Sequence, residues 1–203
     1  MELDFYYHRH SDLLINHDEL FSSDFKEIID VLESITDHDL IAEFKKEKAR
    51  KSSTKSLASS INSIIKARLE VKNWLAEAGL FKEPPYTRKN ASRWRLDFAK
   101  NNISVEVAFN HQEATAHNIL KPVLASELNH VKKEVQTKMG VIIVATKEMK
   151  KAGNFDGAIG TYESFQEYFK PYNNIITTPI VLIGIKAPSS FIIDEETKSR
   201  VFV

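Results

Sequence analysis

The first part of the chain carries hydrophobic residues at helical spacing. Apolar side chains between Phe21 and Leu32 recur every three or four residues, which predicts an amphipathic helix with Ser22 and Ser23 as available caps. Residues 40–50 predict a charged helix or loop. The sequence therefore predicts a mainly helical N-terminal part.

A second apolar stripe begins at Leu57 and repeats at three and four residues as far as Leu75. It predicts one long helix that ends near Gly79, because glycine is common just beyond a helix C-terminus. Pro84 and Pro85 separate this helix from the segment that follows.

The second half contains two continuous apolar runs, GVIIVAT at residues 140–146 and PIVLIGI at residues 179–185. Their length and β-branched content predict strands buried on both faces. Helices are expected at residues 114–138 and 162–169, and Pro122 must lie in the first turn of the former or kink it. The predicted buried stripe of that helix is Leu120, Leu124, Leu128, Val131 and Val135. These elements together predict an α/β domain.

Residues 93–110, RWRLDFAKNNISVEVAFN, predict a β-hairpin, since polar and apolar positions alternate on both sides of Asn101-Asn102. Asparagine tolerates the positive φ that a type I′ turn needs at both positions. With this turn, the predicted apolar partners are Phe98 with Val105, Leu96 with Val107, and Trp94 with Phe109.

The same register places Asp97 directly across from Glu106 on the other face of the hairpin. Like charges at such positions are destabilising, so something must offset their repulsion. A bound divalent cation such as Mg²⁺ would do so, as would Arg95 on the same face, or a proton held by one carboxylate. The pattern alone leaves these three alternatives open.

Composition narrows the classes of protein. The 203 residues suit one domain, and the absence of cysteine excludes disulfides, thiolate metal sites and cysteine nucleophiles. No apolar run approaches the roughly 20 residues of a membrane span, so we expect a cytoplasmic protein with no membrane partner.

The net charge of zero hides an asymmetry along the chain. Residues 1–43 carry 2 basic and 12 acidic side chains, whereas residues 44–100 carry 15 and 5. A middle segment this basic, which includes FKKEKARKSSTK, could hold DNA through phosphate contacts or be a solvated, lysine-rich connection.

The residues around the acidic pair resemble the PD-(D/E)XK nuclease superfamily, and within it the restriction endonucleases of the BglII and BstYI type. The resemblance rests on Leu96-Asp97-Phe98, on the nine-residue separation of the two acids, and on the words VEVAF and PIVLIGIKAP. It implies a restriction-endonuclease-like α/β core, with a central mixed sheet flanked by helices and a helical N-terminal part. We expect a single domain over residues 1–203, with an N-terminal part at 1–56, a nuclease core at 57–188 and a C-terminal tail at 189–203.

This resemblance also implies an activity, namely Mg²⁺-dependent cleavage of double-stranded DNA by a homodimer at a short palindrome built around GATC. Asp97 and Glu106 would be the acidic metal ligands, and the main-chain carbonyl of Val107 could be a third. The alternative is a nuclease-fold protein that binds DNA with altered or lost cleavage.

One position departs from the family pattern. Two residues after the second acid the superfamily usually has lysine, and the BglII and BstYI type has glutamine. This chain has Ala108 there, which can neither bind metal nor orient water. Asn110 is the nearest substitute on the same strand face and is therefore a candidate catalytic residue. His111, Glu113 or Lys121 could also reach in.

The resemblance places two segments against the DNA bases, namely Asn110-His111-Gln112 and the loop GNFDGAIGT at residues 153–161. Asparagine and glutamine pair bidentately with adenine in the major groove. The glycines of the loop would let the backbone approach DNA closely. The expected DNA-binding residues are Asn110, His111, Gln112, Asn154, Asp156 and Gly157.

Overall fold

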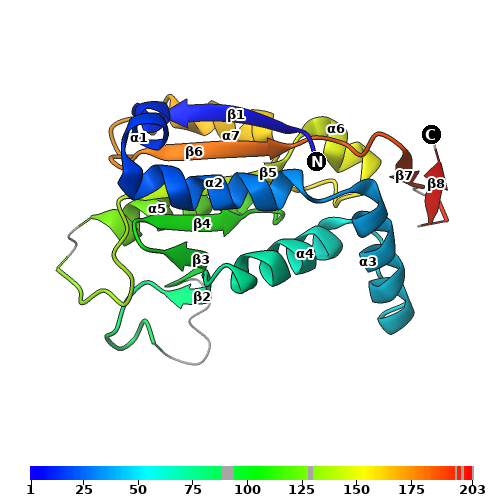
Figure 1. Ribbon diagram of the computed structural model, residues 1–203, viewed down its shortest axis with the longest axis horizontal. Helices are drawn as coiled ribbons and strands as arrows, with labels where there is room; N and C mark the ends of the chain where they lie inside the picture. The colour runs from blue at the N-terminus through cyan, green and yellow to red at the C-terminus, as the bar shows by residue number, and fades with distance from the viewer. Residues whose placement is uncertain (88–93, 128–129, 195, 198, 203) are drawn as a thin grey trace.

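The computed structural model contains one six-stranded mixed sheet with helices on both faces (Figure 1), which confirms the predicted α/β class. It describes residues 1–87, 94–127, 130–194, 196–197 and 199–202. The strand order is β1-β6-β5-β4-β3-β2. Strands β4, β5 and β6 run parallel, whereas the other neighbours pair antiparallel. The strands of this sheet are β1 (Leu3–His8), β2 (Leu75–Gly79), β3 (Arg95–Lys100), β4 (Ile103–Val107), β5 (Met139–Ala145) and β6 (Ile180–Ile185).

The two apolar runs form the centre of the sheet, as predicted. Every residue of β5 and β6 is buried, because helices cover both faces of these strands. One face packs against α1 (Ser11–His17), α2 (Glu19–Glu33), α3 (Asp37–Arg50) and α4 (Ala58–Val71). The other packs against α5 (Thr115–Ser126) and α7 (Tyr162–Phe169). The short α6 (Lys147–Ala152) follows β5.

Side chains of β4 and β5 alternate between these two faces. Val105 and Ile143 pack against the α1–α4 layer, whereas Ala108 and Ile142 pack against α5 and α7. Glu106 lies two residues before Ala108 and therefore shares the α5 face of the sheet.

Several predicted boundaries are wrong. The stripe that begins at Leu57 does not continue as one helix, because α4 ends at Val71 and residues 75–79 form β2. Asn73 adopts a left-handed φ of 63° just beyond the helix, a conformation that ends helices. The predicted helix over 114–138 ends at Ser126, so Val131 and Val135 lie beyond it. Leu128 lies outside the described residues, and Pro122 lies in the helix interior rather than the first turn.

The two ends of the chain also differ from expectation. The N-terminal part begins with β1, an edge strand, before its helices. Asp18 rather than Ser22 or Ser23 caps α2, since its side chain accepts a hydrogen bond from the Leu20 amide. The expected C-terminal tail contains a two-stranded sheet, β7 (Phe191–Ile193) with β8 (Arg200–Phe202).

Ion pairs attach the hairpin to the acidic helix α2. Lys100 donates a 2.7 Å hydrogen bond to Glu27, which also accepts the indole N–H of Trp74 at 2.9 Å. At the turn, Asn101 donates to Asp24 at 2.9 Å. Part of the charge asymmetry along the sequence is therefore satisfied within the fold.

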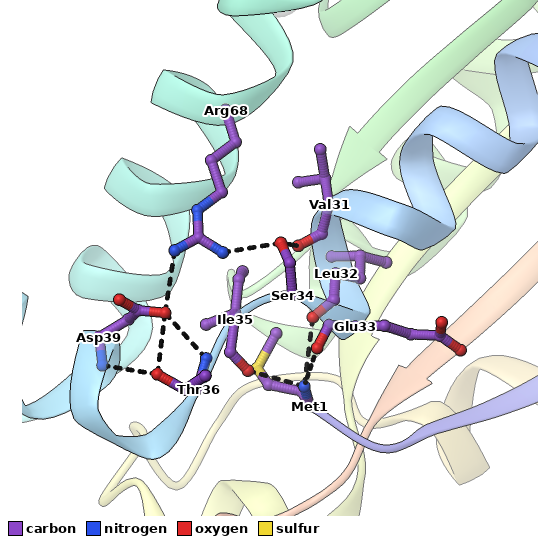
Figure 2. Close-up of polar contacts among 9 residues, drawn as sticks. All are labelled: Met1, Val31, Leu32, Glu33, Ser34, Ile35, Thr36, Asp39 and Arg68. Atoms are coloured by element: carbon purple, nitrogen blue, oxygen red, sulfur yellow. Dashed lines mark hydrogen bonds and ion pairs between the residues drawn. The ribbon is translucent and has the colours of Figure 1, made fainter.

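Arg68 fixes α4 against the junction of α2 and α3 (Figure 2). Its guanidinium donates to Ser34 at 2.8 Å and to the Asp39 carboxylate at 2.9 Å. Asp39 also completes the capping box of α3 with Thr36. This junction holds α4 in place beside β2 and β3, where the candidate site lies.

Candidate active site

The acidic pair lies where β3 and β4 stop pairing. The predicted register is confirmed, with Phe98 opposite Val105 and Lys100 opposite Ile103, so Asp97 and Glu106 are the next residues on each strand. At the turn only Asn101 has a positive φ, of 46°, so the type I′ expectation fails at Asn102.

Beyond Phe98 the carboxylates take the place of the backbone hydrogen bonds. Asp97 Oδ2 accepts the amide of Val107 at 2.7 Å, and Glu106 Oε1 accepts the amide of Asp97 at 3.3 Å. Each acid is thereby fixed by the main chain of the other strand. The two acids therefore lie next to each other at the strand ends, with Asp97 in contact with the amide of Val107.

The predicted apolar pairs beyond this point do not form. Leu96 packs with Leu80 and Phe81 of a separate cluster, whereas Val107 packs against the α1–α4 layer. Trp94 contacts the ring of Phe81, while Phe109 contacts Phe155. The alternation predicted these pairs wrongly because the strands diverge at the acids.

A lysine from α5 faces the pair. Lys121 Nζ lies 2.6 Å from Glu106 Oε2, and the exposed fractions of their side chains are 11% and 2%. Arg95 was one of the three alternatives that the sequence left open, but the positive charge that acts on both acids is that of Lys121. It comes from a helix rather than from the hairpin itself.

Burial dominates the electrostatics of both acids. It raises the pKa of Glu106 from 4.5 to about 8, with the charge of Asp97 acting in the same direction and Lys121 opposing. The pKa of Asp97 is also raised, by burial first, against the hydrogen bond from Val107 and the charge of Lys121. Because burial disfavours the ionised form of both carboxylates, a cation beside them would stabilise that form.

The raised pKa of Glu106 predicts a pH dependence of stability without divalent ions. Because the folded state binds this proton more tightly than the unfolded chain, the free energy of unfolding should fall as pH rises from 4.5 towards 8. The slope due to Glu106 is at most about 1.4 kcal/mol per pH unit. We expect Glu106→Gln to flatten it in urea unfolding measured in EDTA, whereas Glu113→Gln, an exposed control, should keep it. Equal slopes for the wild type, Glu106→Gln and Glu113→Gln would contradict the burial of Glu106 and its raised pKa.

A hollow of about 160 Å³ opens beside Asp97 and Val107, lined also by Asn62 and Lys66 of α4 and by Glu77 of β2. Glu77 reaches this hollow from its strand at a left-handed φ of 53°, whereas Glu70 of α4 does not line it.

The two segments expected to contact DNA lie against each other. His111 forms a β-bridge with Ile159, and the amide of Gln112 donates to the carbonyl of Ala158 at 2.7 Å. The carbonyl of Asn110 accepts the amide of Gly160 at 3.3 Å. Residues separated by almost fifty positions therefore form one surface beyond the end of β4.

The expected DNA-binding residues occupy different positions on this surface. His111, Gln112, Asp156 and Gly157 are exposed, whereas Asn154 donates to the carbonyl of Lys55 at 2.8 Å. The Lys55 contact joins the basic middle segment to the loop.

Asn110, proposed from the sequence as catalytic, also lies at this surface. Its side-chain oxygen accepts a 2.8 Å hydrogen bond from Asn118 of α5. Within the described part of the chain, no hydrogen bond connects its side chain to Asp97 or Glu106.

The glycines of the loop have different roles. A Cβ at Gly157 would meet nothing within 4 Å, so this residue can approach a ligand closely. At Gly153 and Gly160 a Cβ would lie 2.5 and 2.8 Å from the rings of Phe155 and Phe165. Packing therefore explains these two, and the expected close approach to DNA applies to Gly157.

A hollow of about 390 Å³ next to this surface contains residues that sequence reasoning missed. Gln112 and Asn154 line it together with Lys147, Lys150 and Lys151 of α6. The word KEMKKA directly after a buried strand was the available signal, since it places several cations at one end of the sheet.

The fold and the acidic pair at the end of its hairpin define a nuclease of the restriction-endonuclease class. A family model described as restriction endonuclease BglII/BglIII matches residues 3–185. The chain belongs to this family, whose members are site-specific deoxyribonucleases.

Solved structures support the same fold. The chain resembles a crystal structure of restriction endonuclease BglII complexed with a DNA 16-mer, with a TM-score of 0.66 and 19% identity over 100% of this chain and 90% of that one. It also resembles free BglII, with a TM-score of 0.54 and 18% identity over 100% and 91%. No curated protein sequence matches. No helix within the described ranges is long and apolar enough to cross a membrane.

Proposed function

We propose that this protein is a Mg²⁺-dependent endonuclease that hydrolyses phosphodiester bonds of duplex DNA at a short palindromic site containing GATC. The observation that carries the proposal is the meeting of Asp97 and Glu106 at the diverging ends of β3 and β4. Family membership supports the cleavage, and the resemblance to enzymes of the BglII and BstYI type suggests the GATC core.

The residues fit a magnesium ion that also binds substrate. Mg²⁺ is usually held by one or two carboxylates together with waters and phosphate oxygens, rather than by a cage of protein ligands. The described residues contain no cluster of three or more His, Asp or Glu side chains that could hold a metal. Asp97, Glu106 and the carbonyl of Val107 would be its protein ligands.

When bound, the ion would polarise the scissile phosphate and lower the pKa of a water molecule that attacks phosphorus. The protein's own contribution is to hold the two acids in place. The amide of Val107 fixes Asp97, and the amide of Asp97 with the ammonium of Lys121 fixes Glu106. Such preorganisation spares the site a rearrangement when DNA arrives.

Sequence discrimination would come from the joined surface that contains Asn110, His111 and Gln112. The amide side chains of Asn110 and Gln112 can read adenine, a good contact being worth about 1 to 3 kcal/mol. The lysines of α6 lie beside this surface and would hold the phosphates.

A homodimer follows from the proposed palindrome. A two-fold symmetric protein matches a two-fold symmetric site, so each subunit would read one half and cut one strand.

The second candidate is a DNA-binding protein of the same fold with lost cleavage, which Ala108 favours. To separate the two, plasmid DNA is incubated with the protein in Mg²⁺ or EDTA and the fragment ends are sequenced. We expect discrete fragments, in Mg²⁺ only, whose ends share one palindrome. An intact plasmid with retarded mobility in Mg²⁺ would contradict cleavage and support the binder.

A further inference from the structure

Helix α5 presents a buried polar row to the end of β4. Thr115, Asn118 and Lys121 lie at three-residue spacing, which places them along one side of the helix, and all three are buried. Asn118 donates to Asn110, and Lys121 donates to Glu106. One helix therefore holds side chains of both the DNA-facing surface and the acidic pair.

Lys121 differs from the other lysines and arginines of this protein. In the described part of the chain it is the one Lys or Arg that is buried, with 9% of the whole residue exposed. Removing an ammonium group from water costs several kcal/mol unless a close partner compensates. The described partner in hydrogen-bond contact with Lys121 is the carboxyl group of Glu106, at 2.6 Å.

Strand β4 itself provides no cationic side chain beside Glu106. Ala108 lies on the same face as Glu106, two residues further along β4, and its methyl packs against α5 and α7 with Ile119 and Val123. Ala108 therefore leaves the α5 side of Glu106 to whatever the helix delivers. The long stem of Lys121 reaches this place from α5.

The contact also selects between the two oxygens of Glu106. Lys121 holds Oε2, whereas Oε1 lies towards Asp97 and accepts its amide. Because a carboxylate oxygen can accept two partners, Oε1 keeps a second lone pair beside the one that accepts the Asp97 amide. Without the lysine, nothing among the described contacts would fix Oε2.

We propose that Lys121 is the positioning residue of the acidic pair: it orients Glu106 so that Oε1 and Asp97 together face the divalent ion and the scissile phosphate. The inference rests on the proposed function. It adds that the cationic group missing at Ala108 of β4 is provided by Lys121 from helix α5. Lys121 acts through Glu106, so its loss should weaken metal binding as well as cleavage.

Three substitutions separate charge from hydrogen bonding. Lys121→Arg keeps both, Lys121→Gln keeps a donor without charge, and Lys121→Met keeps neither. Lys138→Met is the matched control. Lys138 is exposed and directly precedes β5, at the end of the sheet where β4 begins, whereas the acidic pair lies where β4 ends. Urea unfolding identifies variants that are folded under assay conditions.

The readouts are Mn²⁺ affinity by calorimetry without DNA and the single-turnover cleavage rate at saturating Mg²⁺. We expect Lys121→Met, and to a smaller extent Lys121→Gln, to weaken Mn²⁺ binding about 10- to 100-fold, the range for residues that orient metal ligands, and to slow cleavage. Lys121→Arg should recover part of both, and Lys138→Met should match the wild type. If Lys121→Met proves unfolded, the comparison of Lys121→Gln with Lys121→Arg gives the same test.

Two results would overturn the inference while leaving the proposed function intact. One is a folded Lys121→Gln or Lys121→Met protein with wild-type Mn²⁺ affinity and cleavage rate. The other is a variant that loses stability alone, which would show a structural role. A wild-type protein that neither binds Mn²⁺ nor cuts DNA would instead overturn the proposed function, and this inference with it.

Discussion

Asp97→Asn and Glu106→Gln are each expected to reduce DNA cleavage about 10³-fold or more while leaving the protein folded. Both substitutions keep the size of the side chain and remove the negative charge that would hold the metal ion. A metal ion contributes several kcal/mol of charge stabilisation in the transition state, and each 1.36 kcal/mol is a factor of ten in rate. Single-turnover cleavage at saturating protein and Mg²⁺ is the measurement.

The control for these variants is Glu167→Gln, an exposed acid on α7 outside the candidate site. It should cut DNA at the wild-type rate. Specific DNA binding by Asp97→Asn and Glu106→Gln should persist in a gel-shift assay, since the surface around Asn110 is unchanged. Wild-type cleavage by either variant would show that the pair does not perform the chemistry.

The largest expected loss of stability comes from the central strand. Ile143 on β5 is fully buried and packs between strands β4 and β6, so Ile143→Ala should lower the free energy of unfolding by about 2–5 kcal/mol. Native domains are stable by only about 5–15 kcal/mol, so this is a large fraction of the total. Urea denaturation at constant pH measures it.

Ile192→Ala on β7 is the matched control, because this side chain is 38% exposed. It removes the same atoms and should lower stability far less than Ile143→Ala. Similar losses for the two variants would contradict the placement of β5 at the centre of the sheet.

The sequence predicted best those features that depend on local pattern. Strands β5 and β6 appear as continuous apolar runs, and α7 falls on its predicted range. The register of the hairpin followed from alternation about Asn101-Asn102, and with it the placement of Asp97 and Glu106 next to the last paired residues, Phe98 and Val105.

Features set by distant contacts were not predictable in this way. Strand β1 pairs with β6, more than 170 residues away, so its own pattern gave no partner. Leu75 continued the helical stripe by chance, although it is 54% exposed on β2. The left-handed residue Asn73 was the available signal for the end of the helix.

The candidate site shows the same division. Asp97 and Glu106 could be paired from one hairpin, whereas the choice of Lys121 among several candidates required the position of α5 on the sheet. The joining of the Asn110 segment to residues 158–160 likewise depends on tertiary structure.

The most direct test of the acidic pair is anomalous diffraction from crystals of the protein soaked in MnCl₂. We expect a manganese peak within about 2.5 Å of carboxylate oxygens of both Asp97 and Glu106, beside the carbonyl of Val107. A peak that touches neither or only one of these acids, or no peak at a Mn²⁺ concentration that supports cleavage, would contradict this expectation.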